Sequence, residues 1–237
     1  MADIRVVVWN VEWQSCDSRR GRQIREIIEA EAPDLVFLTE AYSGTLPLRE
    51  AAASPDYGYQ TSDGRRKVLM YSRESWAGVQ THGETDMPLG RCVSALTRVR
   101  GTQLWCCGVC VPWMMAHVAT GAKNRRAWEE HRRFLDAFPN ALGNTPPAVP
   151  AILGGDFNQT IPQSRAPDEC YNALLKATGH LRCVTSGLLP GACSLDVDHV
   201  FVSRHFEVND VRVLPNLGVT GKPLSDHDGI SLDLSFQ

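Results

Sequence analysis

Two apolar runs separated by an amphipathic stretch occupy the first 40 residues. Residues 4–11 are rich in valine and almost free of charge, which predicts a strand inside a sheet. Residues 19–31 place isoleucines on one face and charges on the other, which predicts a helix that Pro33 ends. Residues 35–40 predict a second buried strand. This strand–helix–strand order predicts a layered α/β arrangement.

Short apolar runs follow one another in the middle of the chain, with only loops between them. Residues 41–66 have the composition of a loop, and strands are predicted at 68–72, 92–99 and 104–111. Because no helix intervenes, we expect these strands to pair antiparallel.

The second half of the chain predicts elements of both kinds. Amphipathic patterns predict one helix at 124–138, closed by Pro139, and a shorter helix at 168–178. No repeat, low-complexity tract or linker interrupts the chain, so we expect a single domain over residues 1–237. The remaining strands are predicted at 148–153, within 194–202 after acidic residues, at 206–214 as an alternating edge strand, and at 230–234.

Polar side chains stand at the ends of several apolar runs. Gly154 and Gly155 allow a tight turn after one run, and Asp156 and Asn158 follow two positions apart. Alone, this segment is most typical of a strand that leads into a turn. The pattern recurs, however, and buried polar groups without partners are costly, which favours a shared polar cluster. The residues concerned are Asn10, Glu12, Glu40, Asp156, Asn158, Asp198, Asp226 and His227.

Composition and charge limit the partners of such a cluster. A hydrophobic content of 43% and a charged content of 22% are ordinary for a soluble globular protein of 237 residues. The net charge of −3 gives no overall attraction to nucleic acid or to an anionic membrane. A phosphate-bearing partner therefore needs a metal ion or a local basic cluster. Such clusters occur at Arg19, Arg20 and Arg22, at 65–67, and at Lys123, Arg125 and Arg126.

The cysteines and the apolar runs predict a reduced, cytoplasmic protein. The eight cysteines form no repeated Cys-x-x-Cys pair, and Cys106 and Cys107 lie in an apolar run as small hydrophobic residues. The N-terminal residues lack the pattern of a signal peptide, and no apolar run approaches the length of a membrane span. No protein partner can be inferred from the sequence.

The polar cluster has the composition of a hard-metal site. Carboxylates, amides and one histidine, without thiolates, suit Mg²⁺ or Mn²⁺. Converging carboxylates repel one another unless a cation lies among them. Hydrolysis of a phosphate ester requires a metal ion, a carboxylate that accepts a proton from water, and donors that hold the phosphate oxygens.

Five motifs also carry a family resemblance. In their order, the chain resembles the endonuclease/exonuclease/phosphatase superfamily, and most closely its branch of exonuclease III-type abasic-site endonucleases. The resemblance implies an α/β (α+β) fold, a four-layered αββα sandwich of two mostly antiparallel central sheets flanked by helices, with the site at one end of the sheets. The motifs are Trp9-Asn10-Val11-Glu12, the segment from Pro33 to Glu40, Gly155-Asp156-Phe157-Asn158, Asp198 to Ser203, and Ser225-Asp226-His227.

The resemblance implies a metal-binding role for three acids. Glu40 matches the main metal ligand of the family, and Glu12 and Asp226 match positions at or near the metal shell. Asp156 matches the residue that activates or orients the attacking water.

The resemblance also implies residues that contact the phosphate. Asn10 and Asn158 match residues that hold phosphate oxygens. His227 matches a donor to the phosphate, oriented by Asp198, and a carboxylate fixes a histidine tautomer in this way. His199 matches a structural position.

One segment departs from the family pattern. Abasic-site enzymes resemble Tyr-Val-Pro-Asn where this chain has Cys110-Val111-Pro112-Trp113. Cysteine is a poor substitute for a phenol or imidazole that contacts phosphate, so the departure leaves the metal site intact but puts recognition of DNA lesions in doubt. The residues that could reach the phosphate instead are His117, Lys123, Arg125 and Arg126.

Three functions remain open. The first is a Mg²⁺-dependent phosphodiesterase (a nuclease) that acts on DNA or RNA, although the acidic net charge is unusual for duplex binding. The second is a phosphatase for a small phosphorylated metabolite or a lipid headgroup. The third is a non-enzymatic module, against which the retention of every metal and water-activating position argues.

Overall fold

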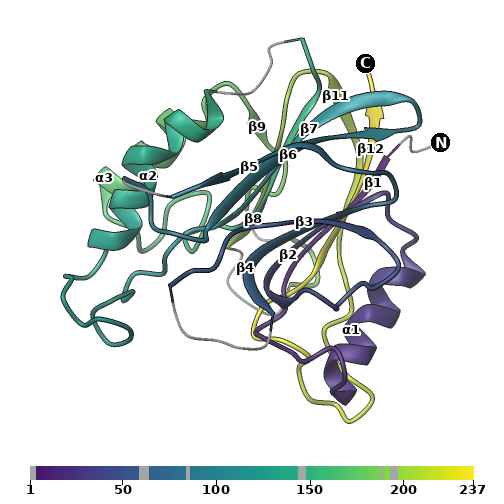
Figure 1. Cartoon of the computed structure of the whole chain (residues 1–237), viewed down its shortest axis with the longest axis horizontal. Helices are drawn as coiled ribbons and strands as arrows, with labels where there is room; N and C mark the ends of the chain where they lie inside the picture. Colours follow the sequence, from purple (N-terminus) through teal and green to yellow (C-terminus); the bar gives the residue numbers. More distant parts are fainter. Residues whose placement is uncertain (1–3, 59–63, 84–85, 144–147, 188, 193–196) are drawn as a thin grey trace.

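Two six-stranded β-sheets pack face to face, and helices cover their outer faces (Figure 1). The computed structural model describes residues 4–58, 64–83, 86–143, 148–187, 189–192 and 197–237. The first sheet has the order β11-β12-β1-β2-β4-β3, and the second has the order β5-β6-β7-β8-β10-β9. This arrangement confirms the four-layered αββα sandwich.

The element bounds are as follows. The first sheet comprises β1 (Ile4–Asn10), β2 (Leu35–Tyr42), β3 (Glu50–Ala53), β4 (Arg65–Ser72), β11 (Phe206–Val213) and β12 (Ile230–Phe236). The second comprises β5 (Ala77–His82), β6 (Cys92–Val99), β7 (Thr102–Cys110), β8 (Ala151–Asp156), β9 (Arg182–Cys183) and β10 (Asp198–Val202). The helices are α1 (Arg19–Ala30), α2 (Glu129–Leu142) and α3 (Asp168–Thr178).

Each sheet contains one parallel pair of strands. Strands β1 and β2 are parallel and are connected through α1, and β7 and β8 are parallel and are connected through α2. All other pairs are antiparallel, including β6–β7 as predicted. The strand predicted at 68–72 was also expected to pair with these strands, but it is part of β4 and pairs with β2 and β3 in the first sheet. Because of these pairings, the carboxyl ends of β1, β2, β7 and β8 lie at the edge where β4, β10 and β12 begin. Strand ends from both sheets therefore lie at one edge of the sandwich.

Three apolar layers hold the sandwich together. Phe37, Met70 and Ile152 belong to the layer between the two sheets. Ile28 of α1 lies in a second layer against the first sheet, and Phe134 of α2 lies in a third against the second sheet. Because both sheets are covered on both faces, their central strands are apolar throughout, which explains the uninterrupted runs in the sequence.

The predicted strands and two of the three predicted helices are found with small shifts at their ends. The strand predicted at 148–153 continues through both glycines to Asp156. Residues 41–66 are not all loop, because β2 extends to Tyr42, β4 begins at Arg65, and β3 lies between them. Of the two acids predicted at the entry to β10, Asp198 begins this strand, and Asp196 lies outside the described residues.

The predicted helix at 124–138 is wrong at both ends. It begins at Glu129, because Trp128 has a φ of 69° and interrupts helical geometry. It also continues through Pro139 to Leu142, although proline breaks one backbone hydrogen bond. Ala141 and Leu142 beyond the proline are buried, so packing on the second sheet offsets the lost bond.

None of the described helices is long and apolar enough to cross a membrane. Every cysteine within the described ranges is a free thiol. Cys106 and Cys107 are completely buried, as expected for small residues in a core strand.

Gly155 allows β8, which ends with Asp156, to lie close to the neighbouring strand β7. Its φ is 140°, and a Cβ atom at this position would lie 2.0 Å from the carbonyl oxygen of Val109 on β7. At Gly154, a Cβ atom would meet only the side chains of Phe37 and Val8, each at 3.3 Å. Side chains can shift, whereas the neighbouring strand cannot without breaking the ladder.

We therefore expect Gly155→Ala to lower the free energy of unfolding by about 3 kcal/mol, and Gly154→Ala by only about 1 kcal/mol. Urea denaturation of the two variants and the wild type measures the difference. Equal losses in the two variants would contradict the assignment of the close approach to Gly155.

Candidate functional site

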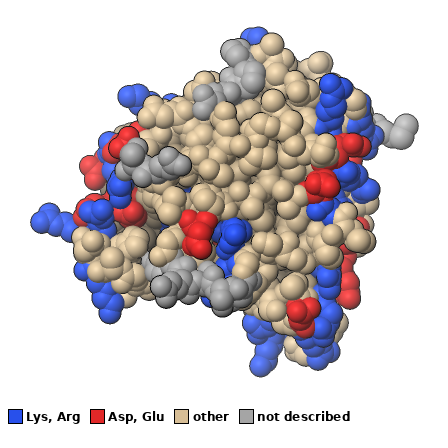
Figure 2. All heavy atoms as spheres, viewed as in Figure 1, with Lys and Arg blue, Asp and Glu red and all other residues tan. Residues whose placement is uncertain are grey.

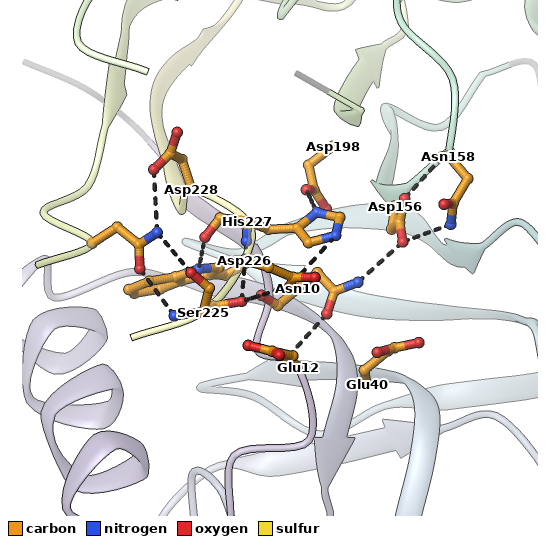
Figure 3. Close-up of polar contacts among 12 residues, drawn as sticks. Asn10, Glu12, Glu40, Asp156, Asn158, Asp198, Ser225, Asp226, His227 and Asp228 are labelled. Atoms are coloured by element: carbon orange, nitrogen blue, oxygen red, sulfur yellow. Dashed lines mark hydrogen bonds and ion pairs between the residues drawn. The ribbon is translucent and has the colours of Figure 1, made fainter. Parts of the chain in front are cut away.

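The polar residues predicted from strand ends meet at the edge described above (Figure 3). Asn10 closes β1, Glu40 lies near the end of β2, and Asp156 closes β8. Asp198 begins β10, and His227 lies in the loop before β12. The two sheets thus contribute to one cluster across the layer between them.

Asp156 is the most firmly held carboxylate of the cluster. It is buried, and its Oδ2 atom accepts hydrogen bonds from Nδ2 of Asn10 at 3.0 Å and from Nδ2 of Asn158 at 2.8 Å. Its Oδ1 atom accepts the backbone N–H of Asn158 at 2.8 Å. These three donors fix the orientation of the carboxylate.

The side-chain amides of Asn10 and Asn158 both donate to Asp156, but they differ in whether an N–H remains for a ligand. Nδ2 of Asn158 also donates to the carbonyl oxygen of Val111 at 2.9 Å, so both of its hydrogens are used. Nδ2 of Asn10 makes one described hydrogen bond, and its Oδ1 atom accepts the backbone N–H of Glu12 at 3.0 Å. Asn10 therefore has a donor to offer a phosphate oxygen, whereas Asn158 acts on Asp156.

The environment of Asp156 disfavours a negative charge. Burial raises the pKa of its carboxyl group to about 7, and the nearby charge of Asp198 contributes in the same direction. The positive charge of His227 and the backbone N–H of Asn158 oppose this shift. The protein thus holds a carboxylate that exchanges its proton near neutral pH.

His227 and Asp198 form the second half of the cluster. The Nδ1 atom of His227 lies 2.5 Å from Oδ2 of Asp198, so the Nε2 atom remains for other partners. Burial opposes protonation of His227, but Asp198, Asp156 and Asp226 outweigh it and raise its pKa to about 10. His227 is therefore an imidazolium that can donate from Nε2.

Main-chain contacts position His227. Its N–H donates to Oγ of Ser225 at 3.2 Å, and its carbonyl oxygen accepts Nε1 of Trp9 at 3.0 Å. Oγ of Ser225 donates in turn to the carbonyl oxygen of Asn10 at 2.6 Å. These contacts join the loop before β12 to the end of β1. The sequence analysis quoted Ser225 and Trp9 only as parts of motifs and assigned them no role.

The cluster has an excess of oxygen acceptors. Ligand atoms of Asp156, Asp198 and His227 all lie within 4.8 Å of one another. Oδ1 of Asp198 is buried and has no hydrogen-bond partner among the described residues. A buried acceptor without a donor is costly, so this oxygen is suited to a bound cation, water or ligand.

Glu40 lies beside this cluster and has a cationic partner. Its Oε1 atom lies 2.6 Å from Nζ of Lys67, at the start of β4. Glu40 and Glu12 have φ values of 51° and 47°, in the left-handed region that is costly for residues with a Cβ atom. Such strain is concentrated at functional sites.

Lys67 is a site residue that the sequence analysis missed. It was placed only in a basic cluster at 65–67, because its role depends on strand register. Thr39 pairs with Val68 and Ala41 pairs with Arg66, so Lys67 lies opposite Glu40. The alternation of these strands could have suggested the pair only once their register was known.

The other predicted residues lie around the cluster. The side chain of Asp226 is 65% exposed, and its Oδ1 atom lies 3.8 Å from Nε2 of His227. Glu12 is exposed as well, and Figure 3 shows it near Glu40. The metal-binding roles of Glu40, Glu12 and Asp226 stay predictions.

The four candidates for phosphate contact do not converge. His117 lines a pocket that also includes Glu40. Arg125 instead forms ion pairs with Glu129 and Glu130, each at 3.1 Å, at the start of α2. Arg126 lines a different hollow along α2, and Lys123 is exposed.

Cys110 is buried in the segment that departs from the family pattern. Burial raises the pKa of its thiol to about 12, so the group is neutral near neutral pH. Nη1 of Arg91 donates to the carbonyl oxygen of Cys110 at 3.1 Å. Arg91, which the sequence analysis did not single out, thus provides a cation at this position.

Comparisons with known proteins give one family and several similar folds. The Endonuclease/Exonuclease/phosphatase family matches residues 7–227. A search of curated proteins finds no match. The human Nocturnin catalytic domain with bound sulfate has a TM-score of 0.70 and 18% identity over 100% of this chain and 94% of that chain.

Two further solved structures have a similar fold. TDP2 of D. rerio complexed with single-strand DNA product has a TM-score of 0.65 and 16% identity over 98% of both chains. The endonuclease domain of TRAS1, a telomere-specific non-LTR retrotransposon, has a TM-score of 0.66 and 15% identity over 99% of both chains. At these identities the likeness shows the fold.

The negative charge of Asp198 raises the pKa of His227, so removing this charge should lower that pKa. We expect Asp198→Asn to lower the pKa of His227 by roughly 2 units or more. Burial lowers this pKa, and the variant lacks the charge that most strongly raises it. The imidazolium would lose its proton closer to neutral pH than in the wild type. Asp226→Asn, which changes an exposed acid, should lower it by less than about 1 unit. NMR titration of the ring signals of His227 measures the pKa in both variants. Equal changes in pKa would contradict the dominant role of Asp198.

Proposed function

Because the chain belongs to the endonuclease/exonuclease/phosphatase family, we propose that it is a Mg²⁺- or Mn²⁺-dependent phosphodiesterase that acts on nucleic acid. The family match confirms the resemblance drawn from the motifs, and the chain is a divalent-metal-dependent hydrolase of phosphate esters. Closeness to the abasic-site branch stays a prediction. The observation that carries the proposal is that ligand atoms of buried Asp156 and protonated His227 lie within 4.8 Å of one another where the two sheets meet.

The residues present fit a divalent metal ion. The predicted ligands Glu40, Glu12 and Asp226 offer only carboxylate oxygens, which suit hard cations. Glu40 already attracts the ammonium group of Lys67, and Asp198 has a buried oxygen without a donor. When bound, the ion would neutralise charge on the phosphate and help a water molecule to ionise.

Asp156 would accept the proton of the attacking water. A general base works best when its pKa lies near the working pH, and the pKa of about 7 meets this condition. Asn158 and Asn10 hold the carboxylate in one orientation, and positioning of this kind lowers the barrier further.

His227 would donate from Nε2 to a phosphate oxygen. Its pKa of about 10 keeps it protonated through neutral pH, and Asp198 fixes the ring through Nδ1. The remaining N–H of Asn10 would give a second donor. Donors fixed before the reaction stabilise the charge that develops on the phosphate in the transition state.

The distribution of charge favours a short or single-stranded substrate over a long duplex. On the face shown in Figure 2, Lys and Arg are interspersed with Asp and Glu near the rim, while much of the centre is uncharged. A duplex is usually held by a broad basic surface. D. rerio TDP2, which has the same fold, is complexed with a single-strand DNA product. The net charge of −3 also supports the second candidate, a phosphatase for a small phosphorylated metabolite or lipid headgroup.

We expect Asp156→Asn and His227→Ala each to lower kcat by about 10²- to 10⁴-fold, because each removes a proton-transfer or donor group. Circular dichroism and thermal unfolding should show a folded protein in both. Asp136→Asn and His180→Ala change exposed residues of the same types outside the cluster and should retain full activity. Undiminished turnover in either site variant would remove the mechanism.

Removal of metal should abolish hydrolysis, and Mg²⁺ or Mn²⁺ should restore it. The assay compares a single-stranded phosphodiester, a phosphomonoester and abasic-site duplex DNA. We expect the single-stranded phosphodiester to be the best substrate. Cleavage of the monoester alone would favour the phosphatase, and inactivity on all three together with absence of metal binding by calorimetry would indicate a non-enzymatic module.

A further inference from the structure

A pocket of about 300 Å³ opens beside Glu40. It lies next to the proposed metal site, because Glu40 and Lys67 line it as well. Its other walls come from segments far apart in the sequence. The lining residues are Trp13, Glu40, Tyr57, Arg65, Lys67, Arg91, Trp113, Ala116, His117 and Thr120.

The charged groups of the pocket favour an anion. Arg65, Lys67 and Arg91 provide three cations, and Glu40 provides one carboxylate. This local excess of positive charge contrasts with the net charge of −3 of the whole chain. An anionic group of a substrate would therefore be drawn to this side of Glu40.

The aromatic rings of the pocket favour a planar group. Trp13 and Tyr57 stack with their ring centroids 5.5 Å apart. Nζ of Lys67 lies 4.8 Å from the ring centroid of Trp13, and the guanidinium carbon of Arg65 lies 5.6 Å from it. One wall of the pocket is thus rigid, because cations and stacked rings support one another.

Trp113 is the aromatic residue best placed to receive a ligand. Its side chain lines the pocket and is 42% exposed, which is unusual for so large an apolar group. Its backbone is anchored, because the carbonyl oxygen of Pro112 lies 2.7 Å from Nδ1 of buried His131. Burial lowers the pKa of His131 to about 4, so this support is a neutral imidazole.

We propose that this pocket binds the base of the nucleotide unit that adjoins the scissile phosphate, with the base stacked on Trp113. The inference rests on the proposed function and names its substrate class. Aromatic rings and cations together match the two parts of a nucleotide, a planar base and an anionic phosphate. A sugar phosphate or a lipid headgroup without an aromatic ring would leave Trp113 without a stacking partner.

The position of Trp113 accords with the departure from the family pattern. It stands where abasic-site enzymes have the asparagine of Tyr-Val-Pro-Asn, three residues after β7 ends with Cys110 and one after Pro112. Compared with that pattern, this segment has an indole in place of the amide and a buried thiol in place of the phenol. It therefore offers a stacking surface where the pattern offers polar groups.

Calorimetry tests the proposal by comparing adenosine 5′-monophosphate with ribose 5-phosphate in the Asp156→Asn background, which prevents turnover. Stacking of one base corresponds to about 5- to 150-fold in affinity, so we expect the adenosine compound to bind at least about 5-fold more tightly. Adding Trp113→Ala should abolish most of this preference, and Trp113→Phe should retain it. Met114→Ala alters a neighbouring, 40% exposed residue that does not line the pocket, and it should change nothing.

Equal binding of the two compounds, or a preference that survives Trp113→Ala, would overturn the base subsite. Activity of the wild type on a single-stranded phosphodiester is measured separately. Hydrolysis without a base preference would leave the proposed function standing and remove the subsite. A base preference that depends on Trp113, in a protein without hydrolytic activity, would support the subsite and reject the proposed function.

Discussion

The buried carboxylate of Asp156 is the group on which the rest of the site depends. A carboxylate without contacts with water is costly, and the fold meets this cost with three hydrogen bonds and a nearby imidazolium. The donors come from β1 and from the turn after β8, and His227 comes from the loop before β12. These elements meet because the carboxyl ends of the parallel pairs β1–β2 and β7–β8 lie at the same edge of the sandwich. Gly155 makes the final approach possible, since any larger residue would collide with β7.

Pairs of opposite charge give this edge its chemistry. His227 balances Asp198, and Lys67 balances Glu40, so neither acid faces the interior unopposed. The two pairs have different consequences. The first sets a donor in place with a raised pKa. The second links the proposed metal ligand to the cationic pocket, because Lys67 contacts Glu40 and also lies over Trp13. A phosphate bound at this edge would thus lie between the positive charges of His227 and Lys67.

Local sequence pattern was sufficient for a layered α/β arrangement and for most of the cluster, whereas the two-sheet sandwich was predicted from the family resemblance. Strands buried on both faces are uniformly apolar, and polar residues at their ends are conspicuous. Strands β3, β5 and β9 escaped prediction because they are short or exposed edge strands that depend on their neighbours for pairing. Lys67 and Arg91 escaped because their roles depend on contacts across strands rather than on adjacent residues. The hydrogen bonds of Asn158, which turn it toward Asp156 and Val111, likewise depend on geometry that no spacing encodes.

The separation of chemistry from recognition follows from this architecture. The groups proposed for hydrolysis lie on strand ends and on the loop before β12, and their mutual contacts leave little freedom to change one without the others. The two tryptophans proposed for recognition, Trp13 and Trp113, lie on the turns after β1 and β7, outside the paired strands, whereas Arg65 and Lys67 belong to β4. A substitution at Trp113 can therefore alter which substrate is held without altering Asp156 or His227. Since His131 supports the backbone of Pro112 from the interior, the exposed indole stands on a fixed base and not on a free loop. An aromatic surface fixed in this way binds a planar group with little loss of conformational entropy, and for that reason we assign substrate selection to this segment.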